Sequence, residues 1–143
     1  MSTTKTARVT WKGTGLDFAS EVGSGYKLDL SSKAGVDAGS PMEMLLAGVV
    51  GCTAIDVVMI LQKQRQPITG LEVEIKAQRA ETYPMVYTDA ELTYIVQGDV
   101  DANAVEKAIE LSEEKYCSAS IMFRQAGVNM QTTYRIEPAA VAV

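Results

Sequence analysis

The 143-residue sequence contains no histidine, and this absence removes several kinds of site at once. Ser-His-Asp and Cys-His catalytic pairs are excluded, as is any metal site built on imidazole ligands. With two cysteines, the chain also cannot complete a four-thiolate zinc site. The reactive groups that remain are thiols, carboxylates, tyrosine, lysine and arginine, and we expect neither a metal nor a bound cofactor.

Positive charge is also scarce. Thirteen basic residues stand against 18 acidic ones, for a net charge of −5, and the basic residues are scattered. Nucleic-acid binding needs a basic face that neutralises phosphates, so we expect no nucleic-acid partner. Residues 1–12 contain no apolar export signal, and the apolar run Met44–Ile55 spans 12 residues, too few for a membrane span. These features predict a cytoplasmic protein without membrane association, in which cysteines are reactive or inert rather than permanently bridged.

Alternation of apolar and polar residues is the main signal for strands. It predicts strands over residues 7–11, 16–21, 26–30, 71–77, 90–96 and 128–136. Short glycine-containing turns separate the first three, which predicts an antiparallel meander with half-buried strands.

A capping box opens the first predicted helix. Ser40 is a capping residue type, Pro41 suits the first helical position, and Glu43 completes the box. The helix is expected to run to about Arg65 and is apolar on nearly every face through Ile55. Such a helix is typical of the centre of a fold or of a subunit interface.

A second capping box, from Asn103 to Glu106, predicts a helix that continues through Ser112. This helix is expected to break near Cys117 and to restart as a short helix over residues 118–123.

The resulting element order is βββ-α-ββ-α-β. Strands that are grouped, rather than strictly alternating with helices, indicate the α+β class. The length suits a single domain over residues 1–143, with a frayed tail at 138–143.

The two cysteines differ in their surroundings. Cys52 is preceded by Gly51 and lies near Gly48, so small residues would let another group approach the helix. A lone cysteine on an apolar helix is more often a core residue, and that interpretation stays open for Cys52. Cys117 lies beside Lys115 at the predicted helix junction, where free backbone N–H groups stabilise a thiolate. This context favours Cys117 as a resolving partner.

The helix that begins Ser40-Pro41-Met42-Glu43-Met44-Leu45-Leu46 and continues to Cys52 resembles a helix of the OsmC/Ohr family. This family comprises the osmotically inducible and organic-hydroperoxide-resistance proteins. The segment Lys115-Tyr116-Cys117-Ser118 is similar to the family's second cysteine region, and the element order agrees over residues 5–136. The Pro-Met-Glu-Met-Leu-Leu version most resembles the less characterised branch of the family.

The resemblance implies an intertwined homodimer with a shared antiparallel sheet around central helices. It also implies a peroxidase for organic hydroperoxides at the dimer interface: Cys52 becomes a sulfenic acid, Cys117 resolves it as a disulfide, and an external dithiol, often a lipoyl group, resets the pair. The alternative is a non-catalytic protein of the same fold that binds an apolar small molecule or lipid, with the cysteines as packing.

The family's hydroperoxidases activate the first cysteine with an arginine from the early strands and a glutamate directly after the helix-start proline. This chain has no arginine from residue 12 to residue 64, and Glu43 comes one position later than that glutamate. We therefore interpret Glu43 first as a capping residue and second as a catalytic candidate. The candidates for the missing cation are Arg8, Arg79 and Arg124, reaching the site from a second copy of the chain.

Asp56 lies one helical turn beyond Cys52 on the same face. It is either a polar member of the site or a residue satisfied by a partner at the end of the buried stretch. Four methionines could line an apolar pocket, although methionines at such spacing are more often core filler. They are Met42, Met44, Met59 and Met122.

Overall fold

The structure is a computed structural model that describes residues 3–139. The chain forms two compact units, Met1–Leu46 and Ala47–Val143, and each is described by itself. The single domain over residues 1–143 stays a prediction. Of the tail expected to fray at 138–143, residues 140–143 lie outside the described part.

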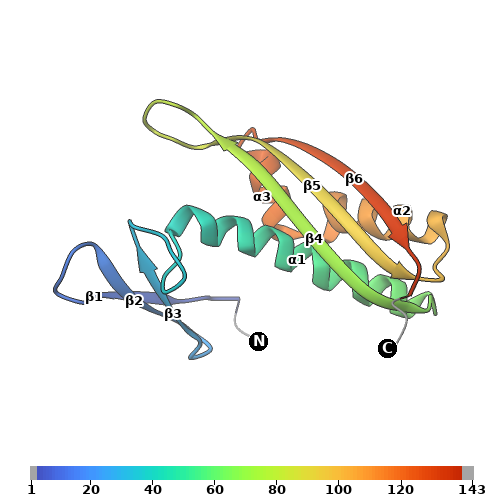
Figure 1. The fold of residues 1–143 in the computed structure, drawn as a ribbon, viewed down its shortest axis with the longest axis horizontal. Helices are drawn as coiled ribbons and strands as arrows, with labels where there is room; N and C mark the ends of the chain where they lie inside the picture. The colour runs from blue at the N-terminus through green and yellow to red at the C-terminus, as the bar shows by residue number, and fades with distance from the viewer. Residues whose placement is uncertain (1–2, 140–143) are drawn as a thin grey trace. The chain divides into compact units, whose positions relative to one another are not determined.

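The first unit contains three strands, β1 (Ala7–Trp11), β2 (Asp17–Val22) and β3 (Lys27–Ser31). They pair in the order β1-β2-β3, each antiparallel to its neighbour, which confirms the predicted meander (Figure 1). Gly13 and Gly25 adopt left-handed backbone conformations in the two turns, with φ of 86° and 94°, and this explains why glycine stands there.

The prediction of a half-buried first strand is wrong for this unit taken by itself. Every residue of β1 is exposed, including Val9 at 56% and Trp11 at 57%. The buried residues described in the unit are Ser20 and Ser31, both polar, because no helix packs a full apolar face against this sheet within the unit. The alternation therefore marks an apolar face that the unit itself leaves open.

The second unit contains the sheet β4 (Ile68–Arg79), β5 (Tyr87–Gly98) and β6 (Asn129–Glu137), in that order. β4 and β5 form an antiparallel hairpin, whereas β6 runs parallel to β5. This sheet is therefore mixed, unlike the antiparallel sheet that the resemblance implies. The reason is the long helical crossover between β5 and β6, which brings the chain back to start in the same direction.

The helices are α1 (Pro41–Lys63), α2 (Ala102–Leu111), the short π-helix η1 (Ser112–Tyr116) and α3 (Ser118–Gln125). The break near Cys117 and the short helix after it are thus confirmed. Within the second unit, the helices lie on one face of the β4-β5-β6 sheet (Figure 1). The α+β class is confirmed.

The predicted capping box at Asn103 and Glu106 is wrong. α2 is capped by Asp101, whose extended backbone suits a cap and whose carboxylate accepts the N–H of Ala104 at 3.0 Å. Asn103 lies inside the first turn, and the Glu106 carboxylate accepts the Tyr134 hydroxyl at 2.6 Å. Asp101, two residues before Asn103, is the capping residue of α2 instead.

The core of the second unit combines alternate residues of β5 with one face each of α1 and α2. The buried apolar residues of this cluster are Val49, Val57, Leu61, Leu92, Tyr94, Val96, Val105, Ala108 and Ile109.

By length and composition alone, α1 is also apolar enough to cross a membrane, since it is longer than the 12-residue run considered above. The core helix of a soluble protein passes the same test, so this is weak evidence for a span. Four residues spaced by one turn on α1 are buried in the second unit, which fits a core helix. They are Val49, Thr53, Val57 and Leu61.

Candidate functional site

The structure brings Cys52 and Cys117 together, although 64 residues separate them in the sequence. Their sulfur atoms and a carboxylate oxygen of Asp56 all lie within 4.8 Å of one another. Both thiols are free; Cys117 is fully buried, whereas Cys52 and Asp56 are half-buried. The three side chains form one cluster with a closed inner side and a more accessible outer side.

α1 places two members of this cluster. Cys52 and Asp56 are four residues apart, so they project from neighbouring turns of one face. Val49, Thr53 and Val57 anchor the adjacent face in the core, which fixes the rotation of the helix. The apolar packing of α1 thus holds Cys52 and Asp56 at the edge of the buried stripe.

The helix junction places the third member. The Cys117 N–H donates to the carbonyl of Ser112 at 2.6 Å and closes the π-helical turn η1. Cys117 then caps α3, with the Ser120 N–H donating to its sulfur at 3.4 Å. Single π-helical turns are frequent at functional sites, and here the turn directs the Cys117 thiol inward.

A chain of buried hydroxyl groups ties these elements together. The Thr53 hydroxyl is hydrogen-bonded to the Tyr94 hydroxyl at 2.7 Å and to the Ser112 hydroxyl at 2.8 Å. The Ser112 hydroxyl also donates to Asp56 Oδ2 at 3.0 Å. Asp56 therefore has a hydrogen-bond partner, as one interpretation of the sequence predicted. It also lies beside the two thiols, which agrees with the other interpretation, that Asp56 is a polar residue of the cluster.

Thr53, Tyr94 and Ser112 were not predicted from the sequence as parts of the site. A signal for Thr53 was present, because it stands on the stripe defined by Val49 and Val57 and a buried hydroxyl needs a partner. Its partners come from a distant strand and a helix end, which spacing along the chain does not reveal.

Burial raises the pKa of the Cys117 thiol, and the neighbouring Cys52 adds to the rise. The contacts with Ser120 act in the opposite direction. Burial likewise raises the pKa of Tyr94, so both groups stay protonated near neutral pH. Cys117 therefore enters any reaction as a thiol rather than as a standing thiolate.

Within one chain, Lys115 and Arg79 have other partners, and a contribution of Arg8, Arg79 or Arg124 from a second copy stays a prediction. Lys115 lies over the Tyr116 ring, 5.3 Å from its centroid, and Arg79 donates to the carbonyl of Met85. Among residues 3–139 no hydrogen bond joins a lysine or arginine to either sulfur. Arg8 lies on β1 in the first unit.

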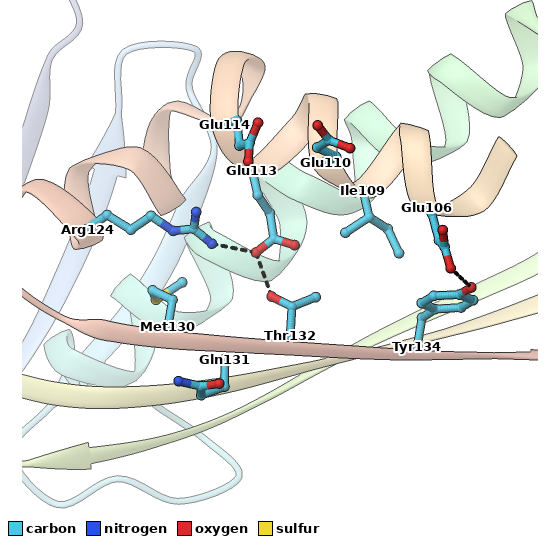
Figure 2. Close-up of a pocket in the computed structure, with 10 residues that line it drawn as sticks. All are labelled: Glu106, Ile109, Glu110, Glu113, Glu114, Arg124, Met130, Gln131, Thr132 and Tyr134. Atoms are coloured by element: carbon cyan, nitrogen blue, oxygen red, sulfur yellow. Dashed lines mark hydrogen bonds and ion pairs between the residues drawn. The ribbon is translucent and has the colours of Figure 1, made fainter. Parts of the chain in front are cut away.

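Arg124 belongs to a hollow of about 430 Å³ between α2, η1 and β6 (Figure 2). Its guanidinium forms an ion pair with Glu113 at 2.7 Å, and the same carboxylate oxygen accepts the Thr132 hydroxyl at 2.7 Å. Glu113 is 4% exposed. This contact fixes α3 against η1 and β6 on either side of Cys117, which makes Arg124 a structural residue here.

Glu43 forms the capping box predicted for it. Its backbone N–H donates to the Ser40 hydroxyl at 3.2 Å, and its carboxylate accepts the Ser40 N–H at 2.9 Å. The second of these bonds lowers the pKa of Glu43. A catalytic role for Glu43 stays a prediction.

Within the second unit, the outer face of α1 is open. A side chain added at Gly48 or Gly51 would meet nothing within 4 Å, and Ile55 and Met59 are 68% and 45% exposed. Met122 is also exposed, so it and Met59 are not core filler. No described residue of the second unit uses the close approach that the glycines permit.

The paired cysteines, the apolar helix that carries the first, and the helix junction that carries the second define an OsmC-like protein. A family model described as OsmC-like protein matches residues 33–133, and the chain belongs to this family. The family includes proteins described as organic hydroperoxide resistance proteins.

Three relatives show how the chain lies within the family. It is 44% identical over 131 residues to the protein YhfA of Escherichia coli K12, covering 91% of this chain and 96% of that one. A hypothetical protein from Aquifex aeolicus is 28% identical with a TM-score of 0.86, covering 97% and 100% of the two chains. An organic hydroperoxide resistance protein from Legionella pneumophila shares the fold, with 18% identity, a TM-score of 0.67 and coverage of 94% and 96%.

Proposed function

We propose that the protein is a thiol-dependent peroxidase that reduces organic hydroperoxides. The observation that carries the proposal is the approach of the Cys52 and Cys117 sulfurs to within 4.8 Å, with Cys52 the more accessible. To form a disulfide bond of about 2.0 Å, the two sulfurs must approach each other by at most about 2.8 Å. Membership of a family that includes hydroperoxide resistance proteins supports the same reaction.

In the first step the Cys52 thiolate attacks the terminal oxygen of the hydroperoxide. The O–O bond breaks, the alkoxide leaves and takes a proton, and Cys52 becomes a sulfenic acid. Cys52 takes this role because it is half-buried, whereas Cys117 is fully buried.

In the second step Cys117 resolves the sulfenic acid. Its sulfur displaces the hydroxyl group of the oxidised Cys52, and the Cys117 proton leaves with that hydroxyl as water while the disulfide forms. The burial that raises the pKa of Cys117 keeps it a protonated, unreactive thiol until the neighbouring sulfur is oxidised. An external dithiol of lipoyl type then reduces the disulfide and becomes oxidised itself. We propose that this cycle takes place in the cytoplasm, where such dithiols are kept reduced.

We propose that the active form is a homodimer. The open face of α1, with Gly48, Gly51 and Ile55, and the exposed sheet of the first unit offer apolar surface that a second copy would cover. Light scattering should show a dimer for the wild type and a monomer for Ile55→Lys. Val36→Lys, which changes another exposed apolar residue on a loop of the first unit, serves as the control and should stay dimeric.

The peroxidase proposal is tested with cumene hydroperoxide and reduced lipoamide as substrates. Cys52→Ser should abolish hydroperoxide consumption, and full activity in this variant would sink the proposal. Cys117→Ser should accumulate a dimedone-reactive sulfenic acid on Cys52, because nothing in the chain then resolves it. Glu114→Gln, an exposed change near Cys117, is the control and should retain wild-type turnover.

A second candidate function is binding of an apolar small molecule without catalysis. It is favoured by a cavity of about 350 Å³ in the first unit, lined mainly by Val9, Leu16, Phe18 and Leu30. Mass spectrometry after one equivalent of hydroperoxide separates the two functions. An intramolecular Cys52–Cys117 disulfide supports the peroxidase, whereas two untouched thiols with retention of a fluorescent fatty acid support the binding protein.

A further inference from the structure

The cluster of two thiols and one carboxylate matches the donor set of a transition-metal site. The Cys52 and Cys117 sulfurs and an Asp56 oxygen lie within 4.8 Å of one another, and all three belong to the second unit. In a tetrahedral zinc site the zinc–sulfur bonds are about 2.3 Å long, which places two thiolate sulfurs about 3.8 Å apart. We propose that Cys52, Asp56 and Cys117 form a zinc site with three protein ligands.

The chemistry of the three ligands favours zinc among the common metals. Thiolates select soft or borderline ions such as zinc and copper(I), and disfavour magnesium and calcium. A carboxylate ligand shifts the preference from copper(I) toward zinc, which binds aspartate oxygen at about 2.0–2.2 Å. No metal was expected from the sequence, because two cysteines without a histidine leave a thiolate or imidazole site incomplete; the third ligand here is Asp56.

Groups around the cluster already orient its members. The Ser112 hydroxyl donates to Oδ2 of Asp56, which leaves the other carboxylate oxygen for a metal. The Ser120 N–H donates to the Cys117 sulfur and restrains its direction. Such outer contacts are what hold first ligands in the geometry a metal requires.

No protein cation competes for the cluster. In residues 3–139 no lysine or arginine forms an ion pair with Asp56 or a hydrogen bond to either sulfur. Binding of zinc would release the protons of the two thiols, and the ion would supply two positive charges against the resulting thiolates and the carboxylate. Three protein ligands leave a fourth position, on the side where Cys52 and Asp56 are half-buried, for water or a small thiol.

Metal binding and disulfide formation exclude each other, since both use the same two sulfurs. A zinc-loaded cluster has no free thiol for a hydroperoxide, so zinc would hold the protein in a protected, reduced form. This consequence rests on the proposed peroxidase, whereas metal binding itself does not.

The test uses the purified full chain, reduced with a phosphine, freed of metal with a chelator and kept anaerobic. Titration with Zn²⁺ against a chromophoric indicator should give one equivalent per chain. Co²⁺ should give the intense visible bands of a four-coordinate ion together with a near-ultraviolet thiolate-to-cobalt band. No hydroperoxide is present, so the result is independent of peroxidase activity.

Variants assign the ligands. Cys52→Ser and Cys117→Ser should each weaken the thiolate-to-cobalt band and lower zinc affinity by at least about 100-fold, while Asp56→Asn should keep the band and lower affinity at least about 10-fold. Glu114→Gln should bind as the wild type does, and circular dichroism verifies that each variant is folded. If Cys117→Ser fails to fold, the other two variants still decide. The proposal is overturned if the wild type shows no saturable zinc binding or if Asp56→Asn binds zinc as tightly as the wild type.

Discussion

The two units of the chain each contain a three-stranded sheet, and the sheets differ in what covers them. The β4-β5-β6 sheet packs one face against helices, and the buried apolar residues of the described chain all lie in its unit. The β1-β2-β3 sheet leaves Val9, Trp11 and Leu16 exposed. The strands of both sheets alternate apolar and polar residues in the sequence. Such alternation therefore indicates that one face of a sheet is suited to burial, but it does not indicate which element covers that face.

The difference bears on function. The cluster around Cys52 and Cys117 lies in the unit that has a core of its own. There the Ser120 N–H donates to the Cys117 sulfur, and the packing of α1 holds Cys52 at the edge of the core. The first unit offers an open apolar sheet, which is marginal by itself because a small sheet needs a covered face to be stable. The thiol cluster thus lies in the second unit, whereas both units offer open apolar surface, on the outer face of α1 and on the β1-β2-β3 sheet.

The largest difference should appear when equivalent apolar side chains are truncated in the two units. Leu61→Ala removes a fully buried side chain from the second unit and should lower the free energy of unfolding by about 2–5 kcal/mol. Leu16→Ala removes a side chain that is 61% exposed and should change it by less than about 0.5 kcal/mol in dilute, monomeric protein. Urea denaturation followed by circular dichroism measures both. A loss above about 2 kcal/mol for Leu16→Ala in the monomer would break the comparison.

A smaller effect should separate the two kinds of ion pair in the second unit. Arg124→Ala leaves the buried Glu113 carboxylate with the Thr132 hydroxyl as its described partner, and should cost about 3 kcal/mol. Arg135→Ala breaks an exposed pair with Glu137 and should cost less than about 1 kcal/mol. Urea titration of the two variants provides the measurement. Equal costs would show that Glu113 is not held in the interior as described.

The hydroxyl chain around the cluster should show a still smaller cost with measurable coupling. Tyr94→Phe removes one hydrogen bond to Thr53 and should cost about 1 kcal/mol. Ser112→Ala removes the other bond to Thr53 and the donor to Asp56. Because the two changes share Thr53, the double variant should depart from additivity by at least about 0.5 kcal/mol. Strict additivity would mean that the hydroxyl groups do not act as one network.

Local signals predicted much of this structure. The features that were predicted depend on residues close together in the chain. They are the meander, the capping box at Ser40, the helix break at Cys117, and the roles of Pro41 and Gly13. The prediction of the second capping box was wrong because two residues of capping type, Asp101 and Asn103, lie two positions apart. Asp101 is the one that caps the helix.

The candidate site was predictable in its members but not in its partners. Cys52, Cys117 and Asp56 were identified from the helix pattern and the family resemblance, and the structure brings them within 4.8 Å. Glu113 and Tyr94 were not identified, since their roles come from contacts with α3, β6 and α1. Pairing between distant elements depends on how helices and strands pack, and no spacing rule encodes it.

The smallest expected effect concerns Glu43, at the end of the first unit. Its pKa is lowered because the carboxylate accepts the Ser40 N–H, so it stabilises the fold above the unfolded-state pKa, and that contribution is lost as pH falls through the folded-state value. Glu43→Gln keeps an amide oxygen that can complete the same capping box without titrating. The melting temperature near pH 7 should therefore change little in the variant. The decrease in melting temperature from neutral to acidic pH should be smaller in the variant than in the wild type, and thermal melts at both pH values measure it. Should Glu43→Gln instead lower hydroperoxide turnover with its stability at neutral pH unchanged, Glu43 would act in catalysis rather than as a cap.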